Sequence, residues 1–459
     1  MNVAIALAIG FNRPAYLEDY RQSADPDGWD YVQLGRNLLL EGHYSRCRRA
    51  PYVPDALRTP GYPVVVGLLE LAGGARAIYF THIVLQAGSC WLLFLFVRPF
   101  LGGAAAFWAS LLFGTDLMLA IHNFEPMSEP LFLLLMLGGA GLVFPVLLAP
   151  GECRHGWGRL LLGGFLLGLT ILTRPVALYL PAIFAVGCLG IGLGRRRMGR
   201  ALCTAAVLLV VALAPAGLWA VRNAVMFSLP RLSYVDANNL IYYSGAGAYQ
   251  LRHGVSVDEA RAMISEEFGL IPVVEVQNAY ISELAPAQID AQLRPAVWRV
   301  LAKYPGHLLL SSAIGVAKAS VSHATAELAE MLNREWVAPG TRNLLVHPVE
   351  AGRRLLQNGL PLALAFAWQT VHVVVALGAA LLGMVLVLRN RRLRSGGLIL
   401  LVVLAYFYTT TALFGCEAYW RCRIPVMPFL YVFSGYGIAR VLGPGRRGRD
   451  ATVLGDAGG

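Results

Sequence analysis

The 459-residue chain is 57% hydrophobic and only 14% charged, and it carries a net charge of +11. A soluble domain of this length needs more charged residues to cover its surface, so the composition excludes an ordinary soluble protein. The excess of cations does not indicate a nucleic-acid-binding protein. These cations lie in short connections beside apolar segments, where they orient a membrane protein.

Apolar residues fall into blocks of about 20 residues, the length that a helix needs to cross about 30 Å of hydrocarbon. Together with shorter blocks, they predict an all-α polytopic membrane protein of about 10 transmembrane helices, within a range of about 9 to 13. Outer-face loops and interfacial helices complete the predicted fold. The clearest blocks are Ile78–Val97, Leu131–Leu148, Val176–Leu193, Ala201–Val221 and Leu360–Leu388.

Three apolar segments are too short or too polar to count as ordinary spans. The N-terminal run Asn2–Phe11 has no cleavage site of small residues, and it is interpreted as a stunted first helix. Val64–Ala72 is too short to cross a bilayer. Tyr304–Val321, which carries His307 and Lys318, is predicted to lie at the membrane interface as an amphipathic helix.

Short Arg-rich connections set the orientation, because arginine-rich loops tend to stay in the cytoplasm. An even number of apolar blocks separates each consecutive pair of these connections, which are Arg154–Arg159, Arg195–Arg200, Arg389–Arg394 and Arg440–Arg449. With all four in the cytoplasm, the outer segments are Asn12–Arg76, His122–Pro130, Thr173–Pro175, Arg222–Gly359 and Gly415–Arg423. This topology predicts that Cys153 faces the cytoplasm and that Cys416 faces the outside.

The topology divides the chain into four parts. We expect a transmembrane catalytic module over residues 1–221, which includes the outer loop 12–76, and an extracytoplasmic region of loops and interfacial helices over 222–358. Transmembrane helices follow over 359–442, and the Gly- and Arg-rich cytoplasmic tail 443–459 is predicted to be disordered.

The cysteines show no CxxC spacing, which argues against a zinc or redox centre. Cys416 and Cys422 flank the last outer turn, in a compartment that permits disulfides. Two alternatives remain open for this pair: a bridge that fixes the turn, with Cys47 as a competing partner, or free thiols.

Carboxylates gather in the first outer loop, at Asp25, Asp27 and Asp30. If a helix begins near Asp27, this carboxylate lies in the first turn beside free backbone N–H groups, and Tyr31 lies one turn later on the same face. A carboxylate held there can take a proton from a hydroxyl group or bind a divalent cation. The alternative is a helix cap in a solvated loop.

The second outer loop brings Glu125, Ser128 and Glu129 directly before the apolar run Leu131–Leu137. A carboxylate at the mouth of a span carries a desolvation cost, which indicates a functional role. Ser128 and Glu129 also suit a helix start, where they would cap free N–H groups and interact with the helix dipole. The two interpretations are compatible.

Five arginines at span ends or in outer turns face the outer side, against the positive-inside tendency. Arg58 begins the rigid Pro- and Gly-containing turn Arg58–Pro63, which aims Arg58 and Tyr62 in definite directions. A single arginine at a span end can simply extend to lipid headgroups. Five on the side of the carboxylates instead indicate a site for a lipid-linked phosphate, because guanidinium groups bind phosphate oxygens bidentately. The other four are Arg174, Arg222, Arg421 and Arg423.

The order of these motifs resembles the GT-C superfamily of membrane glycosyltransferases, in the branch that includes aminoarabinose transferase and protein O-mannosyltransferases. The resemblance covers most of Asp25–Pro425. Its residues are the Asp27–Tyr31 pair, Gly42–Ser45, the Arg58–Pro63 turn, Ser128–Phe132, Leu172–Pro175, the Arg222-Asn223 span end and the Arg423-x-Pro425 turn.

The resemblance implies that a sugar moves from a polyprenyl-phosphate donor to a hydroxyl-bearing acceptor, usually with inversion. The acceptor would be a cell-envelope glycolipid such as lipopolysaccharide, a polysaccharide or a protein. The reaction would take place at the extracytoplasmic face of a bacterial inner membrane, and no nucleic acid takes part. Nucleotide sugars are not available outside the cytoplasm, so a membrane-embedded donor suits this location.

In this scheme Asp27 is the general base or a metal ligand, and Glu129 orients the acceptor or a divalent cation such as Mg²⁺ or Mn²⁺. Arg58 completes the predicted catalytic set. Carboxylate and arginines would supply the base and stabilise the leaving phosphate. The candidates for the donor phosphate are Arg174, Arg222, Arg421 and Arg423, and those for the substrate pocket are Tyr31, Tyr62, Glu125 and Tyr419.

Two alternatives to this enzyme remain. A flippase or other transporter of lipid-linked oligosaccharides should place its charged residues at mid-membrane on broken helices. Here they lie at the outer ends of the spans, which favours an enzyme. An O-antigen-type polymerase is the other alternative, and the acidic first loop argues against it.

Overall fold

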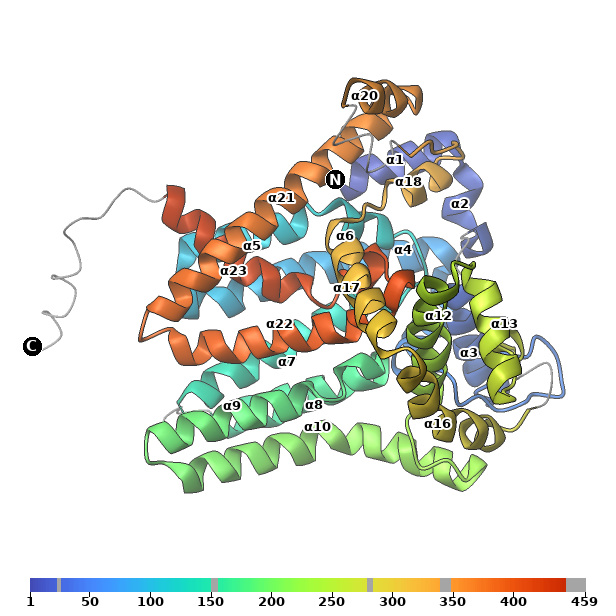
Figure 1. Cartoon of the computed structure of the whole chain (residues 1–459). Helices are drawn as coiled ribbons and strands as arrows, with labels where there is room; N and C mark the ends of the chain where they lie inside the picture. The colour runs from blue at the N-terminus through green and yellow to red at the C-terminus, as the bar shows by residue number, and fades with distance from the viewer. Residues whose placement is uncertain (23–25, 150–155, 279–283, 339–347, 443–459) are drawn as a thin grey trace, which may run out of the picture.

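The computed structural model describes residues 1–459 except 23–25, 150–155, 279–283, 339–347 and 443–459. Within these described ranges the regular elements are all helices and no strand occurs, so the predicted all-α fold is confirmed (Figure 1). Asp25, Cys153 and the predicted disordered tail 443–459 lie outside the described residues.

Seven helices in the described part of the chain are long and apolar enough to cross a membrane. They are α4 (Gly61–Leu101), α7 (Glu129–Leu148), α8 (Gly156–Thr173), η2 with α9 (Pro175–Gly194), α10 (Met198–Phe227), α21 (Leu360–Arg389) and α22 (Arg394–Ala412). Three shorter apolar helices are α1 (Asn2–Asn12), α5 (Gly103–Gly114) and α23 (Met427–Leu442). The polytopic membrane architecture is therefore confirmed, with seven helices of full length against the ten spans predicted.

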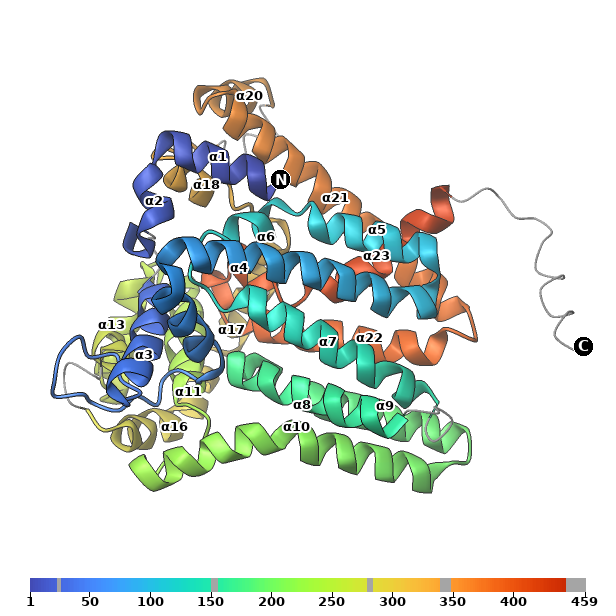
Figure 2. The same cartoon turned by 180° about the vertical axis from the view of Figure 1, so that it is seen from behind.

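The long helices pack side by side into one bundle (Figures 1 and 2). Helix α5 lies between α4 and α23, α23 also packs on α21, and α7, α8, α10, α9 and α22 continue the series. Apolar side chains of all sizes, from alanine to phenylalanine, fill the bundle. The largest fully buried side chains include Phe113, Phe132, Phe144 and Phe433. The buried residues of the bundle form one continuous core, while the outward faces keep exposed leucines and valines.

One end of the bundle carries the smaller helices, most of which precede the first long helix or follow the fifth (Figure 1). Near the N-terminus and in the connections these are α2 (Pro14–Glu18), η1 (Tyr20–Gln22), α3 (Pro26–Glu41), α6 (Leu117–His122), η4 (Gly415–Glu417) and η5 (Trp420–Arg423). Between α10 and α21 they are α11 (Val235–Asn239), η3 (Leu240–Gly245), α12 (Ala246–His253), α13 (Val257–Phe268), α14 (Val273–Gln277), α16 (Pro286–Lys303), α17 (Pro305–Val321), α18 (Thr325–Met331) and α20 (Pro348–Gln357).

The region after α10 has a hydrophobic core of its own, separate from that of the bundle. Buried residues such as Tyr242, Tyr249, Ile264 and Ile289 pack together there with Leu57 of the first loop. The first loop is therefore anchored to this helical region, and the two segments together form the cap over one end of the bundle.

The Arg-rich connections lie at the opposite end. The α9–α10 turn, the α21–α22 turn and the end of α23 all point away from the cap (Figure 1). This arrangement has the alternation that the sequence predicts: basic connections at one end, carboxylates and the remaining arginines at the other. Cys416, in η4, lies at the capped end.

Three segments differ in detail from the sequence-based boundaries. Val64–Ala72 is continuous with α4, separated from the rest of that helix by non-helical backbone at Gly73 and Gly74. Helix α10 continues past Val221 to Phe227. The segment predicted to be interfacial forms α17, which runs across the direction of the bundle in Figure 1. Its buried residues, Ser311, Gly315 and Ala319, lie one turn apart and face the protein.

Candidate active site

Helix α3 places Asp27 in its first turn, as the sequence predicts. The Tyr31 ring lies one turn later, and the guanidinium carbon of Arg58 lies 5.3 Å from its centroid. Tyr31 in turn packs edge-on against Tyr62, with 5.1 Å between the ring centroids. The aromatic stack therefore fixes the direction of Arg58, which reaches back to the Asp27 carboxylate.

Two glycines allow three outer segments to meet at this point. A Cβ atom on Gly61 would lie 2.7 Å from the backbone of Leu172 and Thr173, at the end of α8. A Cβ atom on Gly28 would lie 2.6 Å from the ring of Pro126 in the second outer loop. Only a residue without a side chain permits both approaches, so the first loop, the second loop and the α8 end are held in direct contact.

The charged side chains of these segments form one continuous series of contacts, here called the ion-pair chain. Its first half follows the first loop in the order Asp55, Arg46, Asp30, Arg58 and Asp27, each residue pairing with the next. Asp27 then pairs with Arg421, and Arg421 pairs with Glu129. Glu129 also contacts Arg174 and His122, and His122 in turn contacts Glu125. Five carboxylates thus alternate with four arginines and one histidine.

Arg421 is the centre of this chain, because it contacts both predicted catalytic carboxylates. Its Nε donates to Glu129 Oε1 at 2.6 Å, and its Nη1 lies 3.5 Å from Asp27 Oδ2. Arg174 contacts the same oxygen of Glu129 and also donates to the Ser128 hydroxyl at 3.2 Å. Two arginines predicted to bind phosphate are therefore brought together with Asp27 and Glu129, although Arg421 and Glu129 are 292 residues apart.

The two aspartates of α3 have different proton affinities. Desolvation raises the pKa of the Asp27 carboxyl, but the guanidinium groups of Arg58 and Arg421 outweigh it, and this pKa lies below its ordinary value. For Asp30 desolvation dominates over the attraction of Arg46 and Arg58, and its pKa is raised. Of these two aspartates, Asp27 therefore stays ionised to the lower pH.

Glu129 is almost fully enclosed, with a side chain that is only 2% exposed. Ser128 makes no side-chain cap to the start of α7. The carboxylate of Glu129 instead contacts the guanidinium groups of Arg174 and Arg421 and the imidazole ring of His122. A carboxylate in this position organises the surrounding cations, because a buried charge is stable only when it is paired.

Two further arginines named by the sequence have other surroundings. The Arg222 guanidinium lies over the rings of Trp219 and Phe227, at 4.6 and 4.9 Å from their centroids, and donates to the Asp55 carbonyl at 2.8 Å. Arg423 donates to the Ser320 carbonyl. Arg222 therefore anchors the first loop to α10, and Arg423 anchors η5 to the end of α17.

The predicted pocket residues lie on both sides of the ion-pair chain. Tyr31 is 8% exposed and Tyr62 is fully buried beneath it, where its hydroxyl lies 3.1 Å from His82 Nε2. Tyr62 thus supports Tyr31 from below. Tyr419, beside Arg421 in sequence, is 37% exposed and is the more accessible of these tyrosines. Glu125 contacts His122.

The sequence analysis missed Arg46, Asp55 and His122 as members of the site. Arg46 and Asp55 form a buried pair with 2.6 Å between Nε and Oδ2, and Asp55 Oδ1 also accepts from the backbone N–H of Arg58 at 3.0 Å. They fix the turn that aims Arg58. The only signal was a basic residue and an acidic residue inside an outer loop, a pattern that surface loops show equally often.

A divalent cation bridging Asp27 and Glu129 does not fit this arrangement. The guanidinium of Arg421 already lies between the two carboxylates, at 3.5 Å from one and 2.6 Å from the other. Among the described residues there is also no group of three or more His, Cys, Asp or Glu side chains suited to a metal ion. Cys416 and Cys422 are free thiols in the structure.

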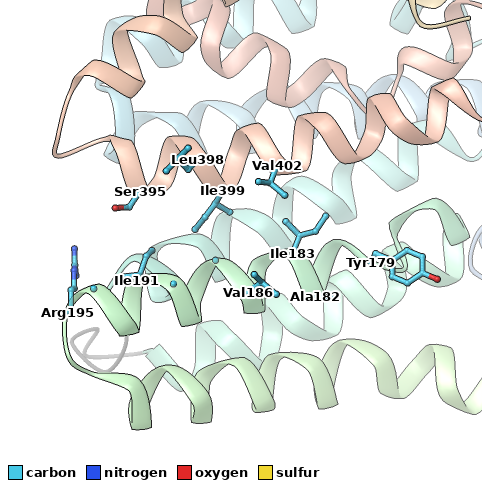
Figure 3. Close-up of a pocket in the computed structure, with 13 residues that line it drawn as sticks. Tyr179, Ala182, Ile183, Val186, Ile191, Arg195, Ser395, Leu398, Ile399 and Val402 are labelled. Atoms are coloured by element: carbon cyan, nitrogen blue, oxygen red, sulfur yellow. The ribbon is translucent and has the colours of Figure 1, made fainter. Parts of the chain in front are cut away.

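A long apolar groove lies between α9 and α22, with a volume of about 710 Å³ (Figure 3). Ile183 and Val186 face it from α9, and Leu398, Ile399 and Val402 face it from α22 (Figure 3). Tyr179 lies at one end, five residues after Arg174, and Arg195 lies at the other. The groove therefore follows α9 from Tyr179 to Arg195, about 24 Å at 1.5 Å per helical residue.

No protein-family model matches the sequence, and no curated protein matches it. Among solved structures, the archaeal oligosaccharyltransferase AglB from Archaeoglobus fulgidus, in complex with an inhibitory peptide and a dolichol-phosphate, matches with a TM-score of 0.50 at 12% identity. That match covers 96% of this chain and 50% of AglB, so this chain spans about half the length of the oligosaccharyltransferase.

ArnT from Cupriavidus metallidurans also matches, at 17% identity over 96% of this chain and 77% of ArnT. The TM-score is 0.37 for its apo state and 0.38 for its complex with undecaprenyl phosphate.

Proposed function

We propose that this chain, which has the fold of the GT-C superfamily of membrane glycosyltransferases, transfers a sugar from a polyprenyl-phosphate-linked donor to a hydroxyl group of a cell-envelope acceptor. The reaction takes place on the extracytoplasmic face of a bacterial inner membrane and inverts the anomeric centre. The observation that carries the proposal is the ion-pair chain, which joins the ionised Asp27 to Arg58, Arg174 and Arg421 at one end of the bundle.

The proposed chemistry follows from the charged groups of the ion-pair chain. The acceptor hydroxyl attacks the anomeric carbon on the face opposite the phosphate, and Asp27 takes its proton. The bond to the phosphate oxygen breaks, and Arg174 and Arg421 stabilise the charge that gathers on the leaving polyprenyl phosphate. Glu129 holds these two arginines in place, and Tyr31 with Arg58 sets the position of Asp27.

The site's location supports an enzyme over a transporter. A transporter of a charged lipid needs polar groups near mid-membrane on interrupted helices. The ion-pair chain instead consists of residues from α3, the outer loops and the ends of α7, α8 and η5. Its cations can contact a phosphate at the membrane surface while the apolar chain stays in the bilayer.

The groove between α9 and α22 suits the isoprenoid part of the donor. It is lined by apolar side chains and three glycines, and the end at Tyr179 lies next to the segment that carries Arg174. A polyprenyl chain placed in it would bury apolar surface and present its phosphate toward the arginines. We therefore propose that this groove binds the carrier lipid.

A bulky side chain in the groove tests this placement. A Cβ atom on Gly190 meets no atom within 4 Å, so Gly190→Trp is expected to fold and to fill the groove. The Michaelis constant for a long polyprenyl-phosphate donor should rise about tenfold, because several buried methylene groups lose their contacts. A donor with a single short isoprenoid chain should bind unchanged. Gly378→Trp, on the outward face of α21, is the matched control. Equal Michaelis constants for the long donor in both variants would contradict the placement.

The proposed function is tested by mass spectrometry of envelope lipids and glycans from a deletion strain. We expect one sugar to be absent from an envelope component and the polyprenyl-phosphate form of that sugar to accumulate. Complementation with wild-type protein should restore the modification, and complementation with Asp27→Asn should not. An envelope identical to that of the parent strain would contradict the proposal.

A further inference from the structure

His122 is a buried ionisable residue to which the mechanism above gives no role. It is the last residue of α6, and the short turn that follows leads into α7. Its ring lies between the carboxylate of Glu125 in that turn and the carboxylate of Glu129 at the start of α7. Nδ1 is 2.9 Å from Glu125 Oε2, and Nε2 is 3.3 Å from Glu129 Oε1.

These two distances favour a charged ring. An ionised carboxylate only accepts hydrogen bonds, whereas a neutral imidazole has one N–H group and one lone pair. A neutral His122 would direct that lone pair at the oxygen of either Glu125 or Glu129, and only the doubly protonated ring offers an N–H group to each. Burial lowers the pKa of His122, but Glu129 and Glu125 outweigh this effect and raise it to about 9.

The charge of His122 decides the net charge of the ion-pair chain. Without it, the chain contains five carboxylates and four arginines and carries one excess negative charge. With an imidazolium at His122 the chain is neutral. The leaving polyprenyl phosphate is an anion with a charge of about −1.5 to −2 at neutral pH, so it binds more weakly to the negative form.

The charged or titratable groups around His122 come from every element packed on it. Glu125 and Glu129 contact it from the turn and from α7, and His82 faces it from α4. Arg174 and Arg421 contact the same oxygen of Glu129 from the α8 end and from η5. His122 is therefore the third cation on Glu129, and its contact leaves the two arginines less fully neutralised by that carboxylate.

We propose that His122, held as an imidazolium by Glu125 and Glu129, is a positioning residue that orients Glu129 and maintains the positive charge with which Arg174 and Arg421 bind the donor phosphate. This inference rests on the proposed function. It predicts strong phosphate binding while the ring is charged and weaker binding once it loses its proton.

The test is the equilibrium affinity of full-length protein in nanodiscs for a polyprenyl monophosphate, measured between about pH 7.5 and 10.5, where the phosphate is already doubly ionised. Wild-type affinity should fall about tenfold as the pH passes about 9, where His122 loses its proton. His122→Gln, which has no charge, should bind about tenfold more weakly at pH 7.5 and show no such fall.

His372→Gln is the matched control. His372 is also buried and lies 3.5 Å from a carboxylate, that of Asp116, and 3.0 Å from the Tyr431 hydroxyl, in a separate polar cluster between α21, α23 and the start of α6. This variant should keep the wild-type affinity and its pH dependence. Equal affinity and equal pH dependence in His122→Gln and wild type would overturn the inference.

A second measurement decides the charge without ligand. Ring-¹⁵N-labelled histidine in the lipid-embedded protein should show one residue with both ring nitrogens protonated at pH 7.5, and this signal should be missing in His122→Gln. A His122 signal typical of a neutral ring would overturn the inference. Failure of the wild type to bind any polyprenyl phosphate would instead count against the proposed function, while the nitrogen signal still reports the state of His122.

Discussion

Asp27→Asn is expected to lower turnover by about 10²-fold or more, as the loss of a general base typically does. Asparagine keeps the size of the side chain and can still accept a hydrogen bond from Arg58, but it cannot take a proton. The Asp27 side chain is about one-third exposed, at 32%, so its replacement should leave the fold intact. The measurement is sugar transfer by purified protein, with thermal melting as the control for folding.

A folded Asp27→Asn variant with near wild-type turnover would show that Asp27 only begins α3. The role of base would then pass to Asp30 or Glu129, or to Asp25 outside the described residues. Asp30→Asn distinguishes the first of these. It should change turnover much less than Asp27→Asn, because Asp30 pairs with Arg46 and Arg58, away from Arg421 and Arg174.

The pH profile gives an independent check on the same base. The folded pKa of Asp27 lies below its ordinary value, so Asp27 remains ionised, and able to accept a proton, as the pH falls toward that value. We expect wild-type turnover to be retained down to about pH 5, below which acidic residues of ordinary pKa begin to protonate. An acidic limb that begins above the ordinary carboxyl range would point to Asp30, whose pKa is raised by burial.

Arg421→Lys is expected to lower kcat/KM for the lipid-linked donor by about 10²-fold, comparable to the loss of one preorganised donor at a developing anion. The guanidinium contacts Asp27 and Glu129 with different nitrogen atoms. A lysine ammonium keeps the charge but cannot make both contacts from one point. Arg354→Lys, in a solvent-exposed pair with Glu350 on α20, is the control and should have no effect. Equal activity of the two variants would contradict the central role of Arg421.

The sequence predicts elements whose signal is local. Asp27 lies in a first helical turn because the Pro26-Asp27 start and the later apolar periodicity are contiguous in sequence. The same holds for the long apolar helices and for the shared side of the outer loops, which follow from hydropathy and parity. Asp27 and Arg58 both belong to the predicted outer loop 12–76, although the sequence does not predict that they pair.

The sequence could not predict the directions in which side chains leave the helix ends, nor the contacts between residues far apart in the chain. Arg421 and Arg423 are two residues apart in η5, and about three residues make one turn of such a helix, so their side chains leave on different sides. Arg421 therefore reaches Glu129, while Arg423 reaches the Ser320 carbonyl. Arg222 sits on α10, a helix that continues beyond the apolar block, where aromatic rings surround it.

His122 illustrates a different limit. In sequence it is one histidine in a turn with two glutamates, and nothing local indicates that the turn closes around its ring. The enclosure arises because α4 and α7 pack against each other beside the end of α6, and the His122 side chain is only 2% exposed. Burial of this kind is set by tertiary packing and leaves no spacing pattern.

The most direct test of the central claim is transfer by purified wild-type protein in nanodiscs. Radiolabelled polyprenyl-phosphate sugars are supplied one at a time, with envelope lipids and glycans of the deletion strain as acceptors. We predict that label from one donor passes to an acceptor and that Asp27→Asn abolishes this transfer. No transfer from any donor, together with protein-dependent movement of a lipid-linked sugar across a sealed bilayer, would contradict the account and identify a transporter.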